Sequence, residues 1–258
     1  MPMNFHNEQN KQSYTTRIAD ASWIELMNTL IEMKQVDHAA DIGCGGGIYT
    51  KTLADLGIRS VTGIDFSEVM IESARMNCRN YNQVKFHVGS DSETGFPNNA
   101  VNLILERALI HHLTDLKPCF KEAFRILKTG GNLIIQDRTP SDCLLEGTNN
   151  HIRGYLFSVF PKLAAIETER RHNSKVVVQN LEDAGFKDIK SVNLWETRQL
   201  YPAKEELLKD IRSRTGRSIL HELNDYELDL FINFLDEKLT DGGIIEKDRW
   251  TVWKAVKK

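Results

Sequence analysis

The sequence is poor in the features that mark secreted, membrane-spanning and nucleic-acid-binding proteins. Its 258 residues include only four cysteines, and no two of them have the Cys-x-x-Cys spacing of zinc or dithiol sites. No apolar run approaches the length of a membrane span, and the N-terminal segment MPMNFHNEQNKQSYTTR lacks the apolar stretch of a signal peptide. The net charge of −3 gives no general attraction to nucleic acid. We therefore expect a cytoplasmic protein with free thiols, no metal and no membrane contact.

Apolar runs of strand length alternate with amphipathic segments of helix length along most of the chain. The predicted strands cover residues 39–42, 60–66, 84–90, 100–106, 132–137, 187–196 and 249–256. The predicted helices cover residues 18–33, 48–57, 67–78, 114–131, 174–186, 204–214 and 225–238. Parallel strands need crossovers of this size, so the pattern predicts an α/β fold with a doubly wound, mostly parallel sheet. Ligands of such sheets bind beyond the carboxyl ends of the strands, where the strand order reverses.

The segment DIGCGGGIYT, Asp41 to Thr50, places four glycines between the first predicted strand and a helix. A dinucleotide loop, Gly-x-Gly-x-x-Gly, would need glycine where Ile48 stands, and the Gly-Lys-Ser/Thr of a phosphate loop is absent. The segment has Asp-x-Gly-x-Gly-x-Gly instead. Glycines carry a conformational-entropy cost, which favours a backbone that comes close to a ligand over a turn without one. A nicotinamide-dependent oxidoreductase stays the alternative enzyme class.

Asp65 ends the second predicted strand. In doubly wound sheets an acidic side chain about twenty residues past the glycine loop accepts hydrogen bonds from ribose hydroxyls. Its charge also repels a 2′-phosphate. The alternative is a cap for the helix that follows Phe66. The glycine loop and this carboxylate together favour a nucleoside ligand.

Four consecutive segments resemble the class I S-adenosylmethionine-dependent methyltransferases, in particular the group with ubiquinone/menaquinone-biosynthesis and other small-molecule enzymes. The segments are DIGCGGG, VTGIDFSEVMIESAR, FPNNAVNLILERALIHHL and AFRILKTGGNLII, within residues 36–140. The resemblance implies a Rossmann-like seven-stranded sheet, S-adenosyl-L-methionine as cofactor and S-adenosyl-L-homocysteine as product. It also implies in-line methyl transfer to an oxygen, nitrogen or carbon atom of a small molecule.

The resemblance implies roles for particular residues. Its cofactor-binding set is Tyr14, Arg17, Asp41, Gly43, Cys44, Gly45, Asp65, Phe66, Met70, Ser90, Asp91, Glu106 and Arg107. The glycine loop would line the methionine part, Asp65 would bind the ribose diol, and Phe66 and Met70 would lie beside the adenine. Glu106 and Arg107 would lie near the methionine end, while the N-terminal pair would close over the cofactor.

Two positions depart from the family's pattern. After the third strand the family usually has Gly-Asp-Ala, whose aspartate contacts the adenine amino group. Here GSDSE places Ser90 at that position and an acid one residue later, at Asp91. Asn102 stands where aspartate is frequent. These departures keep open a module that binds the cofactor without transferring the methyl group.

Two histidines in LIHHL follow the fourth predicted strand, at the ligand-binding edge of the sheet. The sulfonium methyl is already activated, so positioning, worth about 7–11 kcal/mol, is the main catalytic requirement. A general base adds about 10²–10⁴-fold only where the acceptor loses a proton. We expect His112 at the substrate pocket, with His111 as the second candidate. The alternative for either is packing or capping of the next helix.

The remaining segments predict the domain organisation. We expect a helical lid at 1–35, a cofactor-binding core at 36–139 continued at 176–200, lid insertions at 140–175 and 201–246, and a last core strand at 247–258. Tyr155, Trp195, Tyr201, Arg212, Arg214 and Arg217 are candidates for a substrate pocket. Arginine suits carboxylate or phosphate, but charge pairs at i,i+4 spacing equally predict a solvated helix face. The oligomeric state and a protein acceptor stay open.

Overall fold

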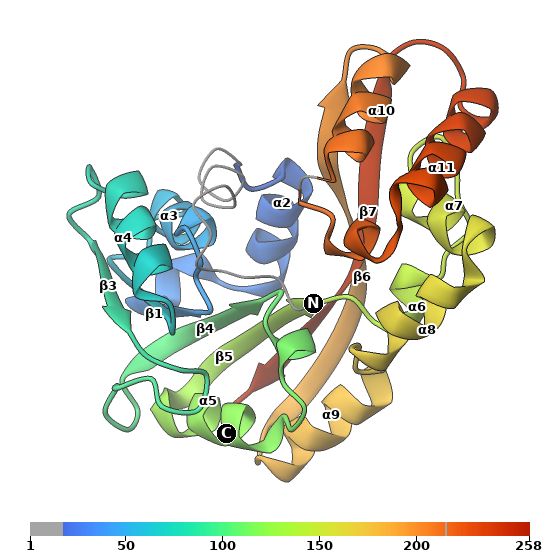
Figure 1. Cartoon of the computed structure of the whole chain (residues 1–258). Helices are drawn as coiled ribbons and strands as arrows, with labels where there is room; N and C mark the ends of the chain where they lie inside the picture. Colours follow the sequence, from blue (N-terminus) through green and yellow to red (C-terminus); the bar gives the residue numbers. More distant parts are fainter. Residues whose placement is uncertain (1–17, 215) are drawn as a thin grey trace. The chain divides into compact units, whose positions relative to one another are not determined.

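The computed structural model describes residues 18–214 and 216–258, which divide into two compact units (Figure 1). The first, here called the sheet unit, comprises residues 18–137, 172–194 and 251–258 of the described chain. The second, the insertion unit, comprises residues 138–171 and 195–250, without residue 215. This division does not test the domain limits or the lid role expected from the sequence, and both remain predictions.

The seven strands have the order β3-β2-β1-β4-β5-β7-β6. Their bounds are β1 His38–Ile42, β2 Ser60–Asp65, β3 Val84–Val88, β4 Val101–Arg107, β5 Leu127–Asp137, β6 Lys187–Tyr201 and β7 Ile244–Val256. The pairs from β3 through β5 are parallel, whereas β7 runs antiparallel to β5. The order reverses between β1 and β4, which places the expected ligand site beyond the carboxyl ends of these two strands. The α/β, doubly wound, mostly parallel seven-stranded sheet is confirmed.

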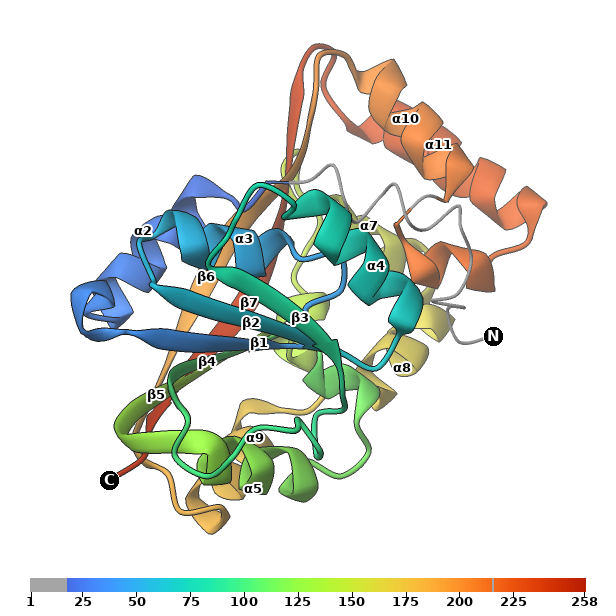
Figure 2. The ribbon, with the colours of Figure 1, turned by 90° about the vertical axis from the view of Figure 1, so that its left-hand side faces the viewer.

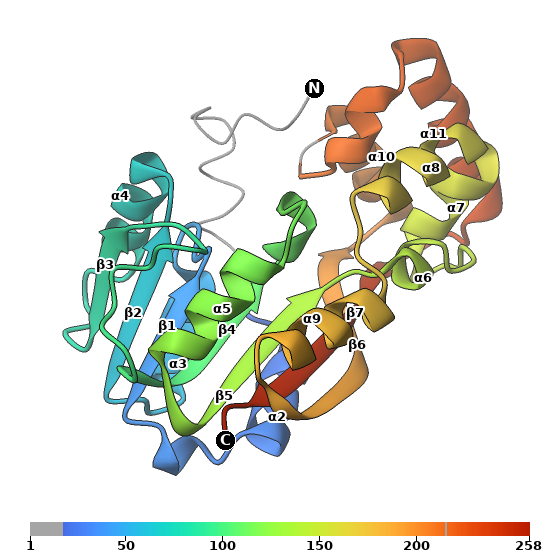
Figure 3. The ribbon, with the colours of Figure 1, turned by 90° about the horizontal axis from the view of Figure 1, so that it is seen from below.

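Helices cover both faces of the sheet unit (Figures 2 and 3). The helical elements of this unit are α2 Ala21–Leu30, η1 Met33–Gln35, α3 Ile48–Asp55, α4 Glu68–Asn77, η2 Ile110–His112, α5 Lys117–Ile126 and α9 Ser174–Asp183. Ala39 and Leu103 pack in one apolar core with α2 and α3, whereas Ala40 and Ile104 pack in another with α5 and α9. Successive strand residues point to opposite faces, so the unbroken apolar runs of β1 and β4 follow from burial on both sides.

Some element limits differ from the sequence prediction. The predicted helix 114–131 is too long, because α5 ends at Ile126 and the double glycine lies in β5. A Cβ on Gly131 would lie 2.8 Å from the carbonyl oxygen of Lys128, so this bend of the strand requires glycine. The strands β6 and β7 also extend beyond their predicted ranges, into the insertion unit.

The insertion unit has an apolar core of its own. Its helical elements are α6 Pro140–Cys143, α7 Ile152–Val159, α8 Pro161–Glu169, α10 Lys204–Ser213, η3 Ser218–Glu222 and α11 Asp225–Lys238. Leu156, Leu207, Phe231 and Leu235 are among the buried residues of this core. Helices α10 and α11 lie side by side (Figures 1 and 2). Across the described residues of both units, every helix is too short or too polar to cross a membrane.

Candidate active site

The glycine loop connects β1 to α3 at the point where the strand order reverses. Gly43, Gly45 and Gly47 have φ angles of 74°, 51° and 79°, a left-handed conformation that side chains disfavour. A Cβ on Gly43 would lie 3.0 Å from Cδ1 of Leu109. At Gly45 no heavy atom lies within 4 Å of a Cβ position. At Gly45 the loop therefore leaves bare main chain beside open space, as a closely approaching ligand requires.

Hydrogen bonds fasten the loop to the neighbouring elements. The N–H groups of Gly43 and Cys44 donate to the carbonyl oxygen of Ile64 at 2.8 and 2.9 Å. The Asp41 carboxylate accepts from the Thr50 hydroxyl at 2.6 Å, and burial raises the pKa of Asp41 to about 6. Asp41 is 2% exposed, so it supports the loop from beneath. Its contact with a ligand stays a prediction.

Asp65 lies at the carboxyl end of β2, in contact with the glycine loop. Its Oδ2 accepts the N–H of Gly45 at 2.9 Å, and its Oδ1 accepts the N–H of Ser67 at 2.9 Å. Burial raises the pKa of Asp65, against the effect of these two hydrogen bonds. A carboxylate has about four acceptor positions, so both oxygens can still accept from a ligand. The structure thus brings together the two features that predict a nucleoside.

The predicted adenine residues show mixed exposure. Phe66 is 63% exposed, whereas Met70 is 5% exposed. Ser90 and Asp91 follow β3, whose last residue pairs with Asp65, and burial raises the pKa of Asp91. These positions lie at the same sheet edge as Asp65, and their adenine contacts stay predictions. The other two members of the predicted cofactor set, Tyr14 and Arg17, lie outside the described residues.

Near the carboxyl ends of β4 and β5, some buried side-chain polar atoms have no hydrogen-bond partner among the described residues. Glu106 is fully buried, with Oε1 accepting from the Cys119 thiol at 3.4 Å, while its Oε2 has no partner among the described residues. Both side-chain polar atoms of Gln136 likewise lack a described partner. Gln136 pairs with Arg107, whose guanidinium lies 4.2 Å from the Tyr49 ring centroid. Buried polar groups usually have hydrogen-bond partners, so these atoms are candidates for contact with a polar ligand.

We predict that Glu106 makes the folded state less stable as the pH rises. Burial raises its pKa from 4.5 to about 8, so between these values the unfolded chain ionises while the folded side chain stays protonated. Over this range Glu106 should lower the free energy of unfolding by a few kcal/mol, as an order of magnitude. Glu106→Gln, which mimics the protonated acid, should remove this decline in urea unfolding measured from pH 5 to 9.

The control is Glu182→Gln, which makes the same change at an exposed position of α9. Its unfolding free energy should run parallel to that of the unmodified chain across the pH series. If the free energies of unfolding of the unmodified chain and of its Glu106→Gln variant differ by the same amount at every pH, the Glu106 side chain does not take up a proton on folding.

A histidine–carboxylate pair lies at the carboxyl ends of β4 and β5: Asp137 is the last residue of β5, and His111 lies in η2, after β4. The Nδ1 atom of His111 lies 2.8 Å from Oδ2 of Asp137, which also accepts the His111 main-chain N–H at 3.1 Å. Asp137 is 1% exposed and His111 is partly exposed. An ionised carboxylate only accepts, so Nδ1 carries the proton and Nε2 of the neutral ring is free to act as a base.

The geometry favours His111, the second candidate from the sequence, over His112, the first. His112 is exposed, and its ring centroid lies 3.9 Å from that of His111, whose Nδ1 and main-chain N–H both contact Asp137. Sequence reasoning missed Asp137. The available signal was its place at the end of NLIIQD, because the carboxyl ends of neighbouring parallel strands meet at one edge.

Comparisons with known proteins agree with this geometry. Residues 40–135 match the family described as a methyltransferase domain. A demethylmenaquinone methyltransferase of Tropheryma whipplei, strain Twist, is 25% identical over 170 residues, which are 64% of this chain and 67% of that protein.

Solved structures share the fold across most of the chain. One, of an Anabaena variabilis protein from an antibiotic biosynthesis pathway, has a TM-score of 0.70 and 20% identity and covers 92% of this chain and 98% of its own. Another is Haemonchus contortus phosphoethanolamine N-methyltransferase 2 with phosphomonomethylethanolamine and S-adenosylhomocysteine. It has a TM-score of 0.57 and 19% identity, covering 96% of this chain and 56% of that one. A further structure of that protein contains S-adenosyl-L-methionine.

The glycine loop left two enzyme classes open. These findings support a methyltransferase and not a nicotinamide-dependent oxidoreductase. The matched residues include the glycine loop, Asp65 and the strand that ends at Glu106 and Arg107. Residues 40–135 match a methyltransferase domain, and the predicted resemblance to the class I S-adenosylmethionine-dependent methyltransferases is confirmed.

Proposed function

We propose that the chain transfers a methyl group from S-adenosyl-L-methionine to an oxygen, nitrogen or carbon atom of a small molecule, with His111 as general base. The observation that carries this proposal is the His111–Asp137 pair at the carboxyl ends of β4 and β5. The strand-order reversal that marks the ligand site involves β4 as well. A base at this edge suits an acceptor that loses a proton.

The residues present fit the cofactor. The bare main chain at Gly45 leaves room for an amino-acid tail to approach the loop closely. Asp65 keeps acceptor capacity for the two ribose hydroxyls. The unpaired polar atoms of Glu106 and Gln136 are further groups that a zwitterionic tail could satisfy. When bound, S-adenosyl-L-methionine supplies a methyl group that is already activated by its sulfonium charge.

The chain's own residues have three tasks in this proposal. The glycine loop and Asp65 hold the two ends of the nucleoside, which fixes the direction of displacement. His111 accepts the acceptor's proton at Nε2. Asp137 keeps Nδ1 protonated and stabilises the imidazolium that forms. The relatives named above act on, or were solved with, small molecules, which supports an acceptor of that kind. The four cysteines are free and buried, which suits the reducing cytoplasm.

Two measurements test the proposal. Calorimetry with S-adenosylhomocysteine should show saturable binding at one site per chain. Incubation of metabolite extracts with methyl-labelled cofactor should then yield a small product heavier by one labelled methyl group. Absence of binding would overturn the cofactor assignment. Label that enters only protein or RNA would overturn the small-molecule acceptor while leaving methyl transfer in place.

A further inference from the structure

The insertion unit contains a cavity of about 30 Å³ that the methyl-transfer mechanism does not use. Its apolar wall comes from α7, α10, η3 and α11, and its charged lining consists of Arg153, Arg198, Arg217, Glu246 and Asp248. Apolar walls with a few charged groups are typical of small-molecule sites. The volume admits the end of a small ligand and is too small for a nucleotide.

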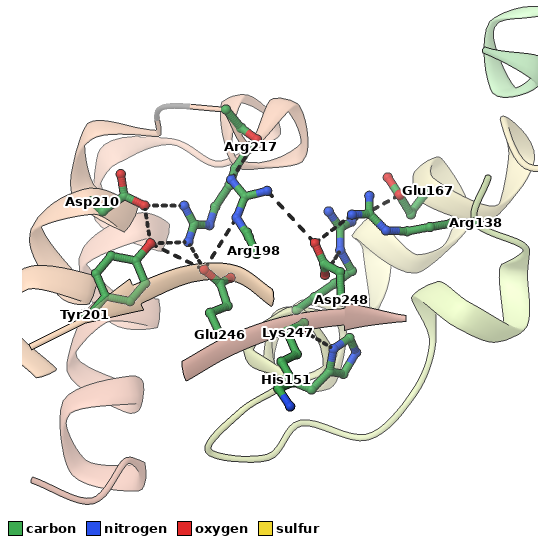
Figure 4. Close-up of polar contacts among 12 residues, drawn as sticks. Arg138, His151, Glu167, Arg198, Tyr201, Asp210, Arg217, Glu246, Lys247 and Asp248 are labelled. Atoms are coloured by element: carbon green, nitrogen blue, oxygen red, sulfur yellow. Dashed lines mark hydrogen bonds and ion pairs between the residues drawn. The ribbon is translucent and has the colours of Figure 1, made fainter. Parts of the chain in front are cut away.

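The charged side of the cavity is built on β6 and β7 (Figure 4). Glu246 and Asp248 lie two residues apart on β7, on the same face, and are 3% and 4% exposed. From β6, Arg198 places Nε 3.4 Å from Oε2 of Glu246 and Nη1 4.0 Å from Oδ2 of Asp248. Side chains at alternate positions of a strand point to the same face, which is why Glu246 and Asp248 lie side by side there.

Two further arginines complete the charged lining. Arg217 donates from Nη2 to Glu246 at 2.7 Å and from Nη1 to Asp210 at 2.5 Å. Arg153, on α7, donates from Nε to Asp248 at 3.4 Å and from Nη1 to Glu167 at 3.1 Å. Its Nη2 donates to no residue that the structure describes. Arg153 therefore presents unused N–H donors at a cavity wall.

The charges of the lining favour an anion. Three guanidinium groups and two carboxylates line the cavity, an excess of one positive charge. Both carboxylates already accept from arginines, so a cation would compete with guanidinium groups for the same oxygens. Burial opposes ionisation of Asp248, but Arg138, Arg153 and Arg198 lower its pKa, so it stays charged beside them. A guanidinium with free N–H groups binds carboxylate or phosphate in preference to neutral groups.

We propose that this cavity binds the anionic end of a small organic acid, a carboxylate or a phosphate monoester on an apolar body, with Arg153 as the principal donor. Leu156, Ile211 and Phe231 line the same cavity and supply apolar contact for the part of the ligand next to its anionic group. The sequence prediction named Arg217 as a pocket residue, and the structure places it in this lining, whereas Arg153 and Arg198 were not foreseen. The assignment concerns binding alone and does not depend on methyl transfer.

The test is calorimetry on the full chain saturated with S-adenosylhomocysteine, so that probes cannot enter the cofactor site. Hexanoate and hexyl phosphate should bind at one site, and whichever binds more tightly identifies the preferred anion. Hexan-1-ol and hexylammonium, which have the same apolar body, should bind at least tenfold more weakly. Equal affinity for the alcohol, or no binding of either anion, would overturn the proposal. Binding of S-adenosylhomocysteine is measured beforehand in a titration of its own, so failure of the proposed function is seen separately.

A matched pair of variants locates the site. Arg153→Lys keeps the charge but removes the forked donors, so we expect at least tenfold weaker binding of the preferred anion. Arg212→Lys makes the same change at an exposed pair with Asp229 and should leave the affinity unchanged. In the unmodified chain, methyl NMR should show the anion shifting Ile152, Ile211 and Ile219 but not Ile104 of the sheet core. Shifts confined to other residues would refute the site even if the lysine variant does not fold.

Discussion

Replacing Asp65 with asparagine is expected to weaken binding of S-adenosylhomocysteine by roughly 100-fold or more. Two ribose hydroxyls that donate to one carboxylate should each contribute about 1.5–3 kcal/mol, because hydrogen bonds to charged groups are the stronger kind. The same carboxylate accepts the N–H of Gly45 at 2.9 Å. An amide at this position cannot accept with both of its terminal atoms, so the glycine loop loses order in the same variant.

The measurement is calorimetry of three nucleosides against the chain and its variant. S-Adenosylhomocysteine reports the whole effect, and its 2′-deoxy and 3′-deoxy analogues each remove one hydroxyl. If Asp65 binds the diol, both analogues bind weakly to the unmodified chain, and the asparagine variant no longer distinguishes them from the parent. Asp37→Asn, at an exposed ion pair with Arg59, is the matched control. If the unmodified chain and the variant distinguish the three nucleosides equally well, Asp65 does not bind the diol and serves only to order the glycine loop.

The sequence predicted the fold from hydrophobic patterning. Apolar runs buried on both faces, separated by amphipathic segments, permit few arrangements other than a covered parallel sheet. The glycine loop and Asp65 were predictable as neighbours, because both end adjacent strands at one edge. Both features can be recognised from nearby residues alone. A left-handed backbone requires glycine, and a carboxylate at the end of a strand requires hydrogen-bond donors.

What the sequence did not predict depends on contacts between distant residues. Asp137 is 26 positions from His111, and its role follows only from the pairing of β4 with β5. The charged cavity draws on Arg153, Arg198 and Asp248, which lie on separate elements of the insertion unit. The buried charges of Glu246 and Asp248 interrupt the apolar pattern of β7, so a prediction based on apolar residues placed the start of that strand too late.

Replacing His111 with alanine is expected to lower kcat by about 10²–10⁴-fold for an acceptor that loses a proton, the usual range for a general base. The affinity for S-adenosylhomocysteine should not change, because the base acts on the acceptor. Asp137→Asn should also slow turnover, by at least about tenfold, because an amide no longer fixes the proton on Nδ1 or stabilises the imidazolium. His112→Ala should have a smaller effect, because His112 is exposed whereas His111 holds the buried Asp137 carboxylate through Nδ1 and its main-chain N–H.

The pH dependence of kcat separates a base from a structural residue. A general base makes turnover fall at acid pH, so the alanine variant should lose the acid limb of the profile if His111 is that base. Added imidazole should restore part of the rate to His111→Ala, because a free base can occupy the space left by the side chain. If His111→Ala and His112→Ala turn over alike, with the acid limb intact in both, neither histidine accepts the proton. Transfer would then depend on positioning by the glycine loop and Asp65 alone.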